Sequence, residues 1–274
     1  MTDEELYRHR LGPLHPRDDM FTGSHQRYYA AGASALEAID WGLTLAGRDW
    51  SAVTTCLDLP CGYGRVLRHL VQRIPPSGIT AADLATEAVD FCVDQFSVRG
   101  LYSKPNVRDV VFPAAYDLIW VGSLFTHLTH ARLGDLLGAL AETLSDDGVL
   151  VFSAVGDDCL DRLLRSEGYA TNLLANKAHQ SASRLAADYV ATGWAFVPYA
   201  GADAYGLTFL STNAIQDLIA DVTSDGIALL GYHRAGWNRD HDVYVVGRRH
   251  ASPLRAYRHA HRARDVAATR AIPA

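Results

Sequence analysis

The sequence has no apolar run near the roughly 18 residues that a membrane-spanning helix requires, which excludes an integral membrane protein. Its start, MTDEELYRHR, lacks the apolar stretch of a secretory signal, so we predict a cytoplasmic location. Cysteine is sparse and no C-x-x-C pair occurs, which favours free buried thiols over a disulfide framework or a zinc site. The four cysteines are Cys56, Cys61, Cys92 and Cys159.

Basic charge is also scarce, since 25 Lys and Arg oppose 31 Asp and Glu and give a net charge of −6. A nucleic-acid binder usually carries a basic patch, and here only the tail at residues 251–274 is rich in arginine. We predict a solvated tail, with a site for a partner or polyanion as the alternative. The partner we expect is a small-molecule acceptor; a homodimer is left open, and no membrane or nucleic acid is expected.

Strand-length apolar runs alternate with amphipathic runs between residues 53 and 156. The pattern predicts an α/β fold, with a parallel sheet covered by helices on both faces. The expected strands are 53–59, 78–84, one within 101–115, 116–124 and 149–156, and the expected helices are 28–47, 65–74, 86–100 and 132–144. Further on, residues 212–222 form a helix capped by Ser211 or Thr212, and two final strands at 227–236 and 242–249 can pair as an antiparallel hairpin.

The alternation breaks at residues 157–206, where an aromatic and glycine-rich stretch, GWAFVPYAGADAYG, occurs. We predict one domain over residues 1–250, with 1–48 as an N-terminal helical cap and 157–206 as an inserted lid. The aromatic rings of the insertion either line a lid over a flat or glycosylated acceptor or form the insertion's own small core. These rings are Tyr169, Trp194, Phe196, Tyr199 and Tyr205.

A glycine turn lies in CLDLPCGYGRVLRHL, between an apolar strand and an amphipathic run. Glycines Gly62 and Gly64 let a ligand approach the backbone N–H groups of the turn. The turn lacks the third glycine of a dinucleotide fingerprint, because Leu67 stands there, and this argues against NAD or FAD. A phosphate-binding P-loop is excluded because no Gly-Lys-Ser/Thr follows.

Two carboxylates flank the turn. Asp58 precedes the glycines, where it would repel a phosphate but suits an ammonium or sulfonium group. Asp83 ends the next strand, where an acid can accept hydrogen bonds from ribose hydroxyls. Together with the glycines, these acids fit a nucleoside with a cationic amino-acid arm, which is S-adenosylmethionine.

At these residues the sequence resembles the class I S-adenosylmethionine-dependent methyltransferases. LDLPCGYGR is similar to their first motif, Asp83 matches their ribose-binding acid, and YDLIWVGSLFTHL and LAETLSDDGVLVFSAVG resemble the later motifs. The resemblance implies a Rossmann-like, seven-stranded sheet whose last strand is antiparallel. Pro60 replaces the usual first glycine, as in a bacterial branch associated with sugar and natural-product modification, which YGLTFLS and GWNRDHDVYVV also resemble.

The resemblance and the strand positions together imply a set of cofactor-binding residues. Gly122 and Ser123 are expected at the methionine part, Asp109 at the adenine amino group, and Tyr28 and Gly32 over the cofactor from the N-terminal helix, unless these two simply pack in the core. The full set is Tyr28, Gly32, Asp58, Pro60, Gly62, Gly64, Asp83, Leu84, Asp109, Gly122 and Ser123.

Methyl transfer to an oxygen requires removal of a proton, for which histidine is suited. His127, just past the fourth strand, is the first candidate base and His130 the second; the alternative is a capping or packed histidine. His241 beside Asp242 is a third, weaker candidate. No further ligand accompanies HLTH at metal-site spacing, so we predict no metal.

The predicted function is methyl transfer from S-adenosylmethionine to a small molecule, at a hydroxyl of a sugar or secondary metabolite. Two alternatives stand beside it. One is a cofactor-binding protein of a biosynthetic pathway that does not methylate, cyclase-like or regulatory. The other is a protein or RNA methyltransferase recruited through the basic tail.

Overall fold

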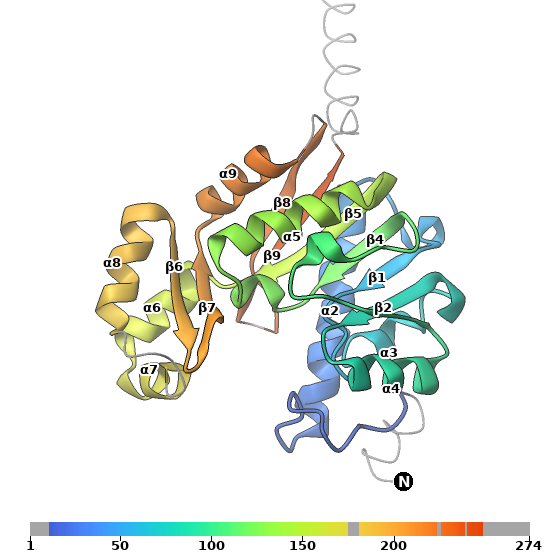
Figure 1. Ribbon diagram of the computed structural model, residues 1–274, viewed down its shortest axis with the longest axis horizontal. Coiled ribbons are helices and arrows are strands. Elements are labelled where there is room, and N and C mark those ends of the chain that lie inside the picture. The colour runs from blue at the N-terminus through green and yellow to red at the C-terminus, as the bar shows by residue number, and fades with distance from the viewer. Residues whose placement is uncertain (1–10, 175–180, 224–225, 239, 249–274) are drawn as a thin grey trace, which may run out of the picture.

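A computed structural model describes residues 11–174, 181–223, 226–238 and 240–248 (Figure 1). The predicted basic tail, residues 251–274, lies outside the described residues. Seven strands form one sheet in the order β3-β2-β1-β4-β5-β9-β8, with β9 antiparallel to both of its neighbours. This confirms the Rossmann-like prediction and the final hairpin. The strands are β1 (Cys56–Asp58), β2 (Ile79–Asp83), β3 (Arg99–Tyr102), β4 (Tyr116–Val121), β5 (Leu144–Ala154), β8 (Ile227–Trp237) and β9 (His241–Arg248).

Helices cover both faces of this sheet. On one face α2 (His25–Leu45), α3 (Leu67–Leu70) and α4 (Thr86–Phe96) share a core with β1, β4 and β5, whereas α5 (His130–Glu142) and α9 (Thr212–Val222) bury the other. Ser211 caps α9 by accepting from the N–H of Ala214, which agrees with the first of the two predicted caps. Four short 3₁₀ turns complete this part: η1 (Trp50–Ala52), η2 (Pro76–Gly78), η3 (Val107–Asp109) and η4 (Leu124–Thr126).

Two predicted helices are longer than the observed ones. The helix expected at 65–74 is regular only over α3, and the turns after it mix i−3 and i−4 hydrogen bonds. The helix expected to end at Gly100 ends at Phe96, and Ser97 adopts a left-handed conformation with φ of 56°. Gly100 instead lies inside β3, where an added Cβ would come within 2.8 Å of Val93 of α4. The glycine therefore allows close packing of strand and helix, and does not mark a helix end.

The insertion forms a lobe beside the sheet (Figure 1). It contains α6 (Asp157–Arg165), α7 (Glu167–Leu174), α8 (Ala182–Thr192) and an antiparallel hairpin of β6 (Trp194–Tyr199) and β7 (Ala202–Leu210). Buried side chains from α6, α8 and the hairpin form a core separate from the two cores of the sheet. Residues 207–210 belong to β7, and Ser211 follows as the cap of α9.

Arg68 fixes the segment before α2 against the glycine turn. Its side chain is fully buried and donates hydrogen bonds to the carbonyls of Leu11, Gly12 and Pro13, and also to those of Tyr63 and Gly64. One guanidinium thus ties two stretches of backbone that are distant in sequence. The ring of Tyr28 lies 5.4 Å from the guanidinium carbon and adds a cation–π contact.

Candidate functional site

The glycine turn connects β1 to α3 at the carboxyl edge of the sheet. Gly62 and Gly64 have φ of 49° and 79°, in the left-handed region that favours glycine. A Cβ on Gly64 would lie 2.7 Å from the ring of Phe96, whereas a Cβ on Gly62 would meet no atom within 4 Å. Gly64 therefore allows the turn to pack on α4, and Gly62 leaves open space where the turn faces a cavity.

Asp58 is a buried carboxylate in this site. Its side chain is 1% exposed, and Oδ2 has no hydrogen-bond partner in the structure. Burial raises the pKa of Asp58 to about 8; the charge of Asp83 adds to the rise and Arg65 opposes it. A buried acceptor without a partner is costly, and a cationic ligand in the adjoining cavity would offset that cost.

Asp83 lies at the junction of two cavities. Its Oδ2 accepts from the N–H of Gly62 at 2.9 Å and its Oδ1 from the N–H of Ala85 at 3.0 Å, so the carboxylate holds the glycine turn in place. One cavity, of about 250 Å³, lies over the turn and is lined by Asp58, Pro60, Gly62, Gly122 and Ser123, among others. The second, of about 520 Å³, lies beside β2 and contains Leu84. Asp83 and Pro60 line both.

Gly64, which packs on α4, lines neither of these two cavities, and three other predicted cofactor residues are not brought to them either. Asp109 is exposed at the end of η3, whereas Asn106 and Val107 of the same segment line the second cavity. Gly32 packs against α3, where an added Cβ would approach the carbonyl of Arg65 and the ring of His69. For Gly32 the core-packing alternative is therefore the one the structure supports.

Tyr28 is the third of these residues and is almost fully buried. Its hydroxyl donates to Asp18 at 2.5 Å, and burial raises its pKa above the ordinary value. Asp18 lines the cavity over the turn, so Tyr28 reaches that cavity only through Asp18.

His127 lines the cavity over the glycine turn. Its Nδ1 lies 2.8 Å from the carbonyl oxygen of Gly206 and 3.1 Å from the hydroxyl of Tyr199, and its ring stacks on Tyr205. Because a carbonyl only accepts hydrogen bonds, Nδ1 carries the proton and Nε2 is the acceptor nitrogen of the neutral ring. The backbone N–H of Gly206 in turn donates to the carbonyl of His127. The hairpin of the insertion thus sets the tautomer of this histidine.

The other two candidate bases, His130 and His241, lie elsewhere in the structure. His130 is exposed at the start of α5, 5.4 Å from the ring of Trp194, and lines none of the described cavities. His241 contacts the hydroxyl of Ser153 through Nδ1 at 3.2 Å, and burial lowers its pKa to about 4. Asp242 accepts from the N–H of Ala235, so it does not orient the neighbouring imidazole in the described contacts.

Several lining residues were absent from the sequence prediction. Arg65 follows the glycine turn directly, and its position after a motif could have identified it. Met20 and Trp237 come from distant segments, and only the fold brings them to the cavity over the turn. The insertion's rings divide between the two predicted roles: Tyr199 and Tyr205 contact His127, whereas Tyr169 packs on the insertion's own core.

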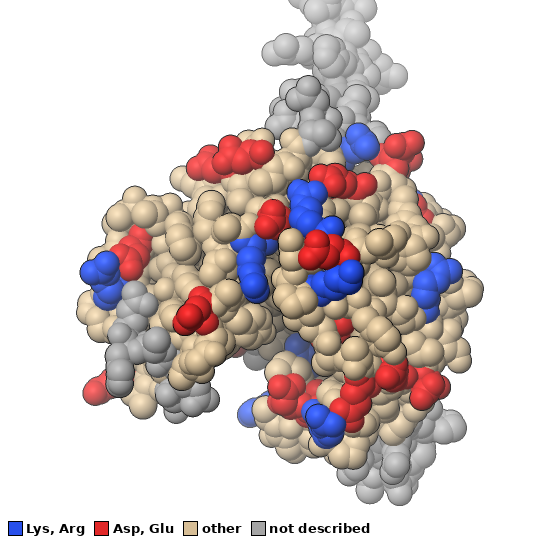
Figure 2. Space-filling view, in the orientation of Figure 1, with Lys and Arg blue, Asp and Glu red and all other residues tan. Residues whose placement is uncertain are grey.

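Two features are absent from the described residues, a metal-binding cluster and a membrane-spanning helix. No three His, Cys, Asp or Glu side chains there lie close enough together to bind a metal ion. No helix in that part of the chain combines the length and apolar character needed to cross a bilayer. On the face shown in Figure 2, basic side chains are interspersed with acidic ones.

Comparison with known proteins identifies a methyltransferase domain in part of the chain. A family model described as a methyltransferase domain matches residues 57–150, from β1 into β5. A malonyl-acyl-carrier-protein O-methyltransferase of Acetivibrio thermocellus is 30% identical over 101 residues, which are 36% of this chain and 35% of that protein. The chain therefore matches about a third of that relative's length.

Solved structures extend the likeness to most of the chain. The sugar N-methyltransferase KedS8 of a Streptoalloteichus species has a TM-score of 0.55 at 14% identity, covering 87% of this chain and 94% of that one. DesVI of Streptomyces venezuelae has a TM-score of 0.51 at 13% identity, with coverage of 83% and 100%. The complex of DhpI with SAH has a TM-score of 0.52 at 14% identity, covering 90% of this chain and 98% of that one. Residues 57–150 therefore match a methyltransferase domain, and the chain has the fold of S-adenosylmethionine-dependent methyltransferases.

Proposed function

We propose that this protein transfers the methyl group of S-adenosylmethionine to a hydroxyl of a small molecule, a sugar or a secondary metabolite. The observation that carries the proposal is the buried carboxyl group of Asp58, whose Oδ2 has no hydrogen-bond partner, beside a cavity over a glycine turn. A cationic ligand in that cavity would favour the ionised form of this group and be stabilised by it, whereas a phosphate would be destabilised.

The residues present fit this cofactor. Asp58 and the turn would hold the cationic amino-acid arm, and Asp83, where the two cavities meet, would accept from the ribose hydroxyls. Leu84, Asn106 and Val107 in the second cavity offer an apolar and amide surface for a base. When bound, the cofactor supplies an electrophilic methyl carbon on a sulfonium.

His127 is the proposed general base. Its Nδ1–H is committed to the carbonyl of Gly206, so Nε2 is the nitrogen that would take the acceptor's proton. Because Gly206, Tyr199 and Tyr205 belong to the insertion, we propose that the lobe acts as a lid that both covers the site and orients the base. His130, exposed and outside the cavities, is not retained in this role.

Binding and transfer should be measured separately. Calorimetry with S-adenosylhomocysteine should show binding to the wild type and to Asp217→Ala, an exposed control on α9, but at least tenfold weaker binding to Asp83→Ala. Labelled S-adenosylmethionine should then transfer label to a hydroxyl-bearing acceptor. Absence of binding to the wild type refutes the proposal. Binding without transfer to any acceptor favours the alternative of a cofactor-binding protein that does not methylate.

A further inference from the structure

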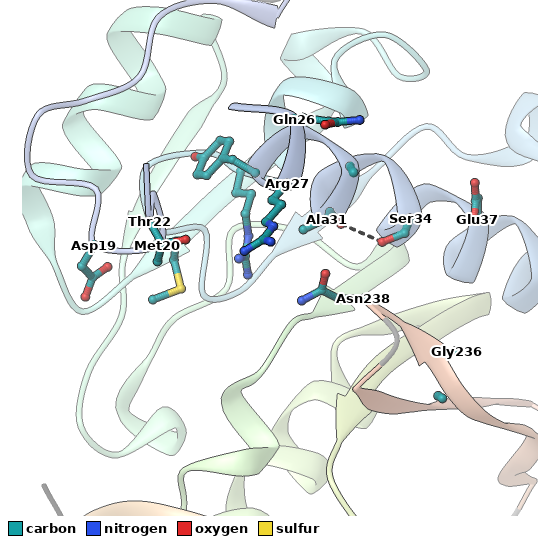
Figure 3. A pocket seen from close by; sticks show the side chains of 14 residues that line it. Asp19, Met20, Thr22, Gln26, Arg27, Ala31, Ser34, Glu37, Gly236 and Asn238 are labelled. Carbon is teal, nitrogen blue, oxygen red and sulfur yellow. Dashed lines mark hydrogen bonds between the residues drawn. The ribbon is translucent and has the colours of Figure 1, made fainter. Parts of the chain in front are cut away.

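A third cavity, of about 880 Å³, shares lining residues with the cofactor cavity. Figure 3 shows the side chains that line it. Four parts of the chain form its walls: the segment with Asp19 and Met20, α2 from Gln26 to Glu37, Arg65 after the glycine turn, and the end of β8 with Asn238 directly after it. Its volume lies within the range of about 300–1,000 Å³ common for small-molecule sites. Among the residues that line this cavity, Tyr28 alone belongs to the predicted cofactor-binding set, and it reaches the cofactor cavity only through Asp18.

The wall on α2 is a stripe of polar and small side chains at helical spacing. Arg27, Ala31 and Ser34 follow one another at intervals of four and three residues, and Glu37 continues the stripe. Figure 3 shows Asn238 facing this helix from the opposite side. A helix in contact with the core normally presents apolar side chains, so a polar stripe toward a cavity indicates contact with a polar ligand or with solvent.

The third cavity adjoins the cofactor cavity. Asp19, Met20 and Arg65 line both, so these residues form the partition between them. The guanidinium of Arg65 lies over the ring of Trp237 at 5.4 Å, and the indole N–H of Trp237 donates to the carbonyl of Ala31. Trp237 is thereby fixed to α2, and the side chain of Arg65 packs over it in this partition.

The side chains that line this cavity indicate which class of ligand it can bind. It offers two carboxylates, two guanidinium groups, two amides and two aliphatic hydroxyls among fourteen residues, so its formal charges cancel. The one aromatic residue is Tyr28, whose hydroxyl is bound to Asp18. Paired donors and acceptors of this kind suit vicinal hydroxyls, whereas a flat aromatic ligand would find few apolar surfaces and would desolvate charged groups.

We propose that this cavity binds the acceptor, and that the bound part is an uncharged, polyhydroxylated group such as a glycoside. The inference rests on the proposed function, since the shared residues place this ligand next to the methyl donor. It also decides between the flat and the glycosylated acceptor in favour of the latter.

The test uses the full chain saturated with S-adenosylhomocysteine and a panel of methyl glycosides, with catechol as the planar probe. Saturation-transfer NMR should show binding of at least one glycoside and no binding of catechol. Ser34→Leu, which places an apolar side chain in the cavity, should weaken the glycoside at least tenfold, whereas Ser183→Leu on the exposed side of α8 should not change it.

The affinity for S-adenosylhomocysteine serves as the folding control, and we expect it to stay within twofold in both variants. Absence of binding by every glycoside, binding of catechol alone, or a glycoside affinity unaffected by Ser34→Leu would each overturn the inference. A wild type that does not bind S-adenosylhomocysteine at all would instead refute the proposed function, so the two failures are distinguishable.

Discussion

Replacing Asp58 with asparagine should stabilise the ligand-free protein, and the gain should grow as the pH rises. The side chain is 1% exposed, and burial raises its pKa from the ordinary 3.8 to about 8. In the folded protein the carboxyl group therefore keeps a proton that the unfolded chain releases above about pH 4. Folding must take up that proton, and this uptake becomes more costly as the solution becomes less acidic.

The size of the effect follows from proton linkage. The stability contributed by the raised pKa is fully present below pH 3.8 and is lost as the pH rises to about 8. Each pH unit within this window removes at most about 1.4 kcal/mol, so at pH 7, about three units into it, the loss reaches about 4 kcal/mol as an upper limit. Asparagine does not titrate, and the variant avoids this loss.

Urea unfolding of both proteins at pH 5, 6 and 7 measures the difference. His69 and His241, whose pKa values burial lowers to about 4, titrate alike in wild type and variant, so their effect cancels in the difference. A stability difference that stays constant or shrinks between pH 5 and pH 7 would refute the reasoning, as would a variant less stable than the wild type at pH 7.

Asp117→Asn is the matched control. Although burial acts to raise it, hydrogen bonds from Thr54, Ser145 and Thr55 hold the pKa of Asp117 below its ordinary value. This carboxylate is ionised in both the folded and the unfolded chain between pH 5 and 7, so its replacement should destabilise the protein by the same amount at each pH. The same chemical change then gives opposite signs at the two positions.

Three further predictions follow from the site. Arg68→Met should lower the free energy of unfolding by about 3–5 kcal/mol in urea titrations, because buried carbonyls lose their donor; a change below about 1 kcal/mol would contradict this. Gly64→Ala should lower the free energy of unfolding by about 1–3 kcal/mol more than Gly62→Ala in the same assay, because only the Cβ added at position 64 meets the Phe96 ring. Equal losses in the two variants would contradict this prediction. His127→Gln should reduce kcat by about 10²–10⁴ with the affinity for S-adenosylhomocysteine unchanged, and full activity would remove the histidine as base.

Most of the sheet could be predicted because its central strands contain continuous apolar runs. β3 differs from them, since its residues are mostly exposed and include Arg99 and Gly100. Neither residue favours a strand by propensity. Gly100 lies there because α4 packs on it, a tertiary requirement that resembles a helix stop when only the sequence is considered.

The candidate site divides in the same way. Residues on the turn and on the ends of β1, β2 and β4 were predictable, because parallel strands end at one edge of the sheet and the motif is contiguous. Asp109 was misplaced by three residues, since the loop after β3 forms a 3₁₀ turn that places Asn106 and Val107 in the cavity. Trp237 lies 206 residues from its hydrogen-bond partner Ala31, a separation that no local pattern records.

Arg68 links the structure of the cofactor cavity to that of the proposed acceptor cavity. No carboxylate pairs with this buried guanidinium among its described hydrogen bonds; it donates instead to five backbone carbonyls, three before α2 and two in the glycine turn. One side chain thus couples the path of the segment before α2 to that of the turn. That segment continues to Asp19 and Met20, which line both the cofactor and the acceptor cavities. Disturbance of the turn should therefore reach the acceptor cavity even though no glycine of the turn lines it.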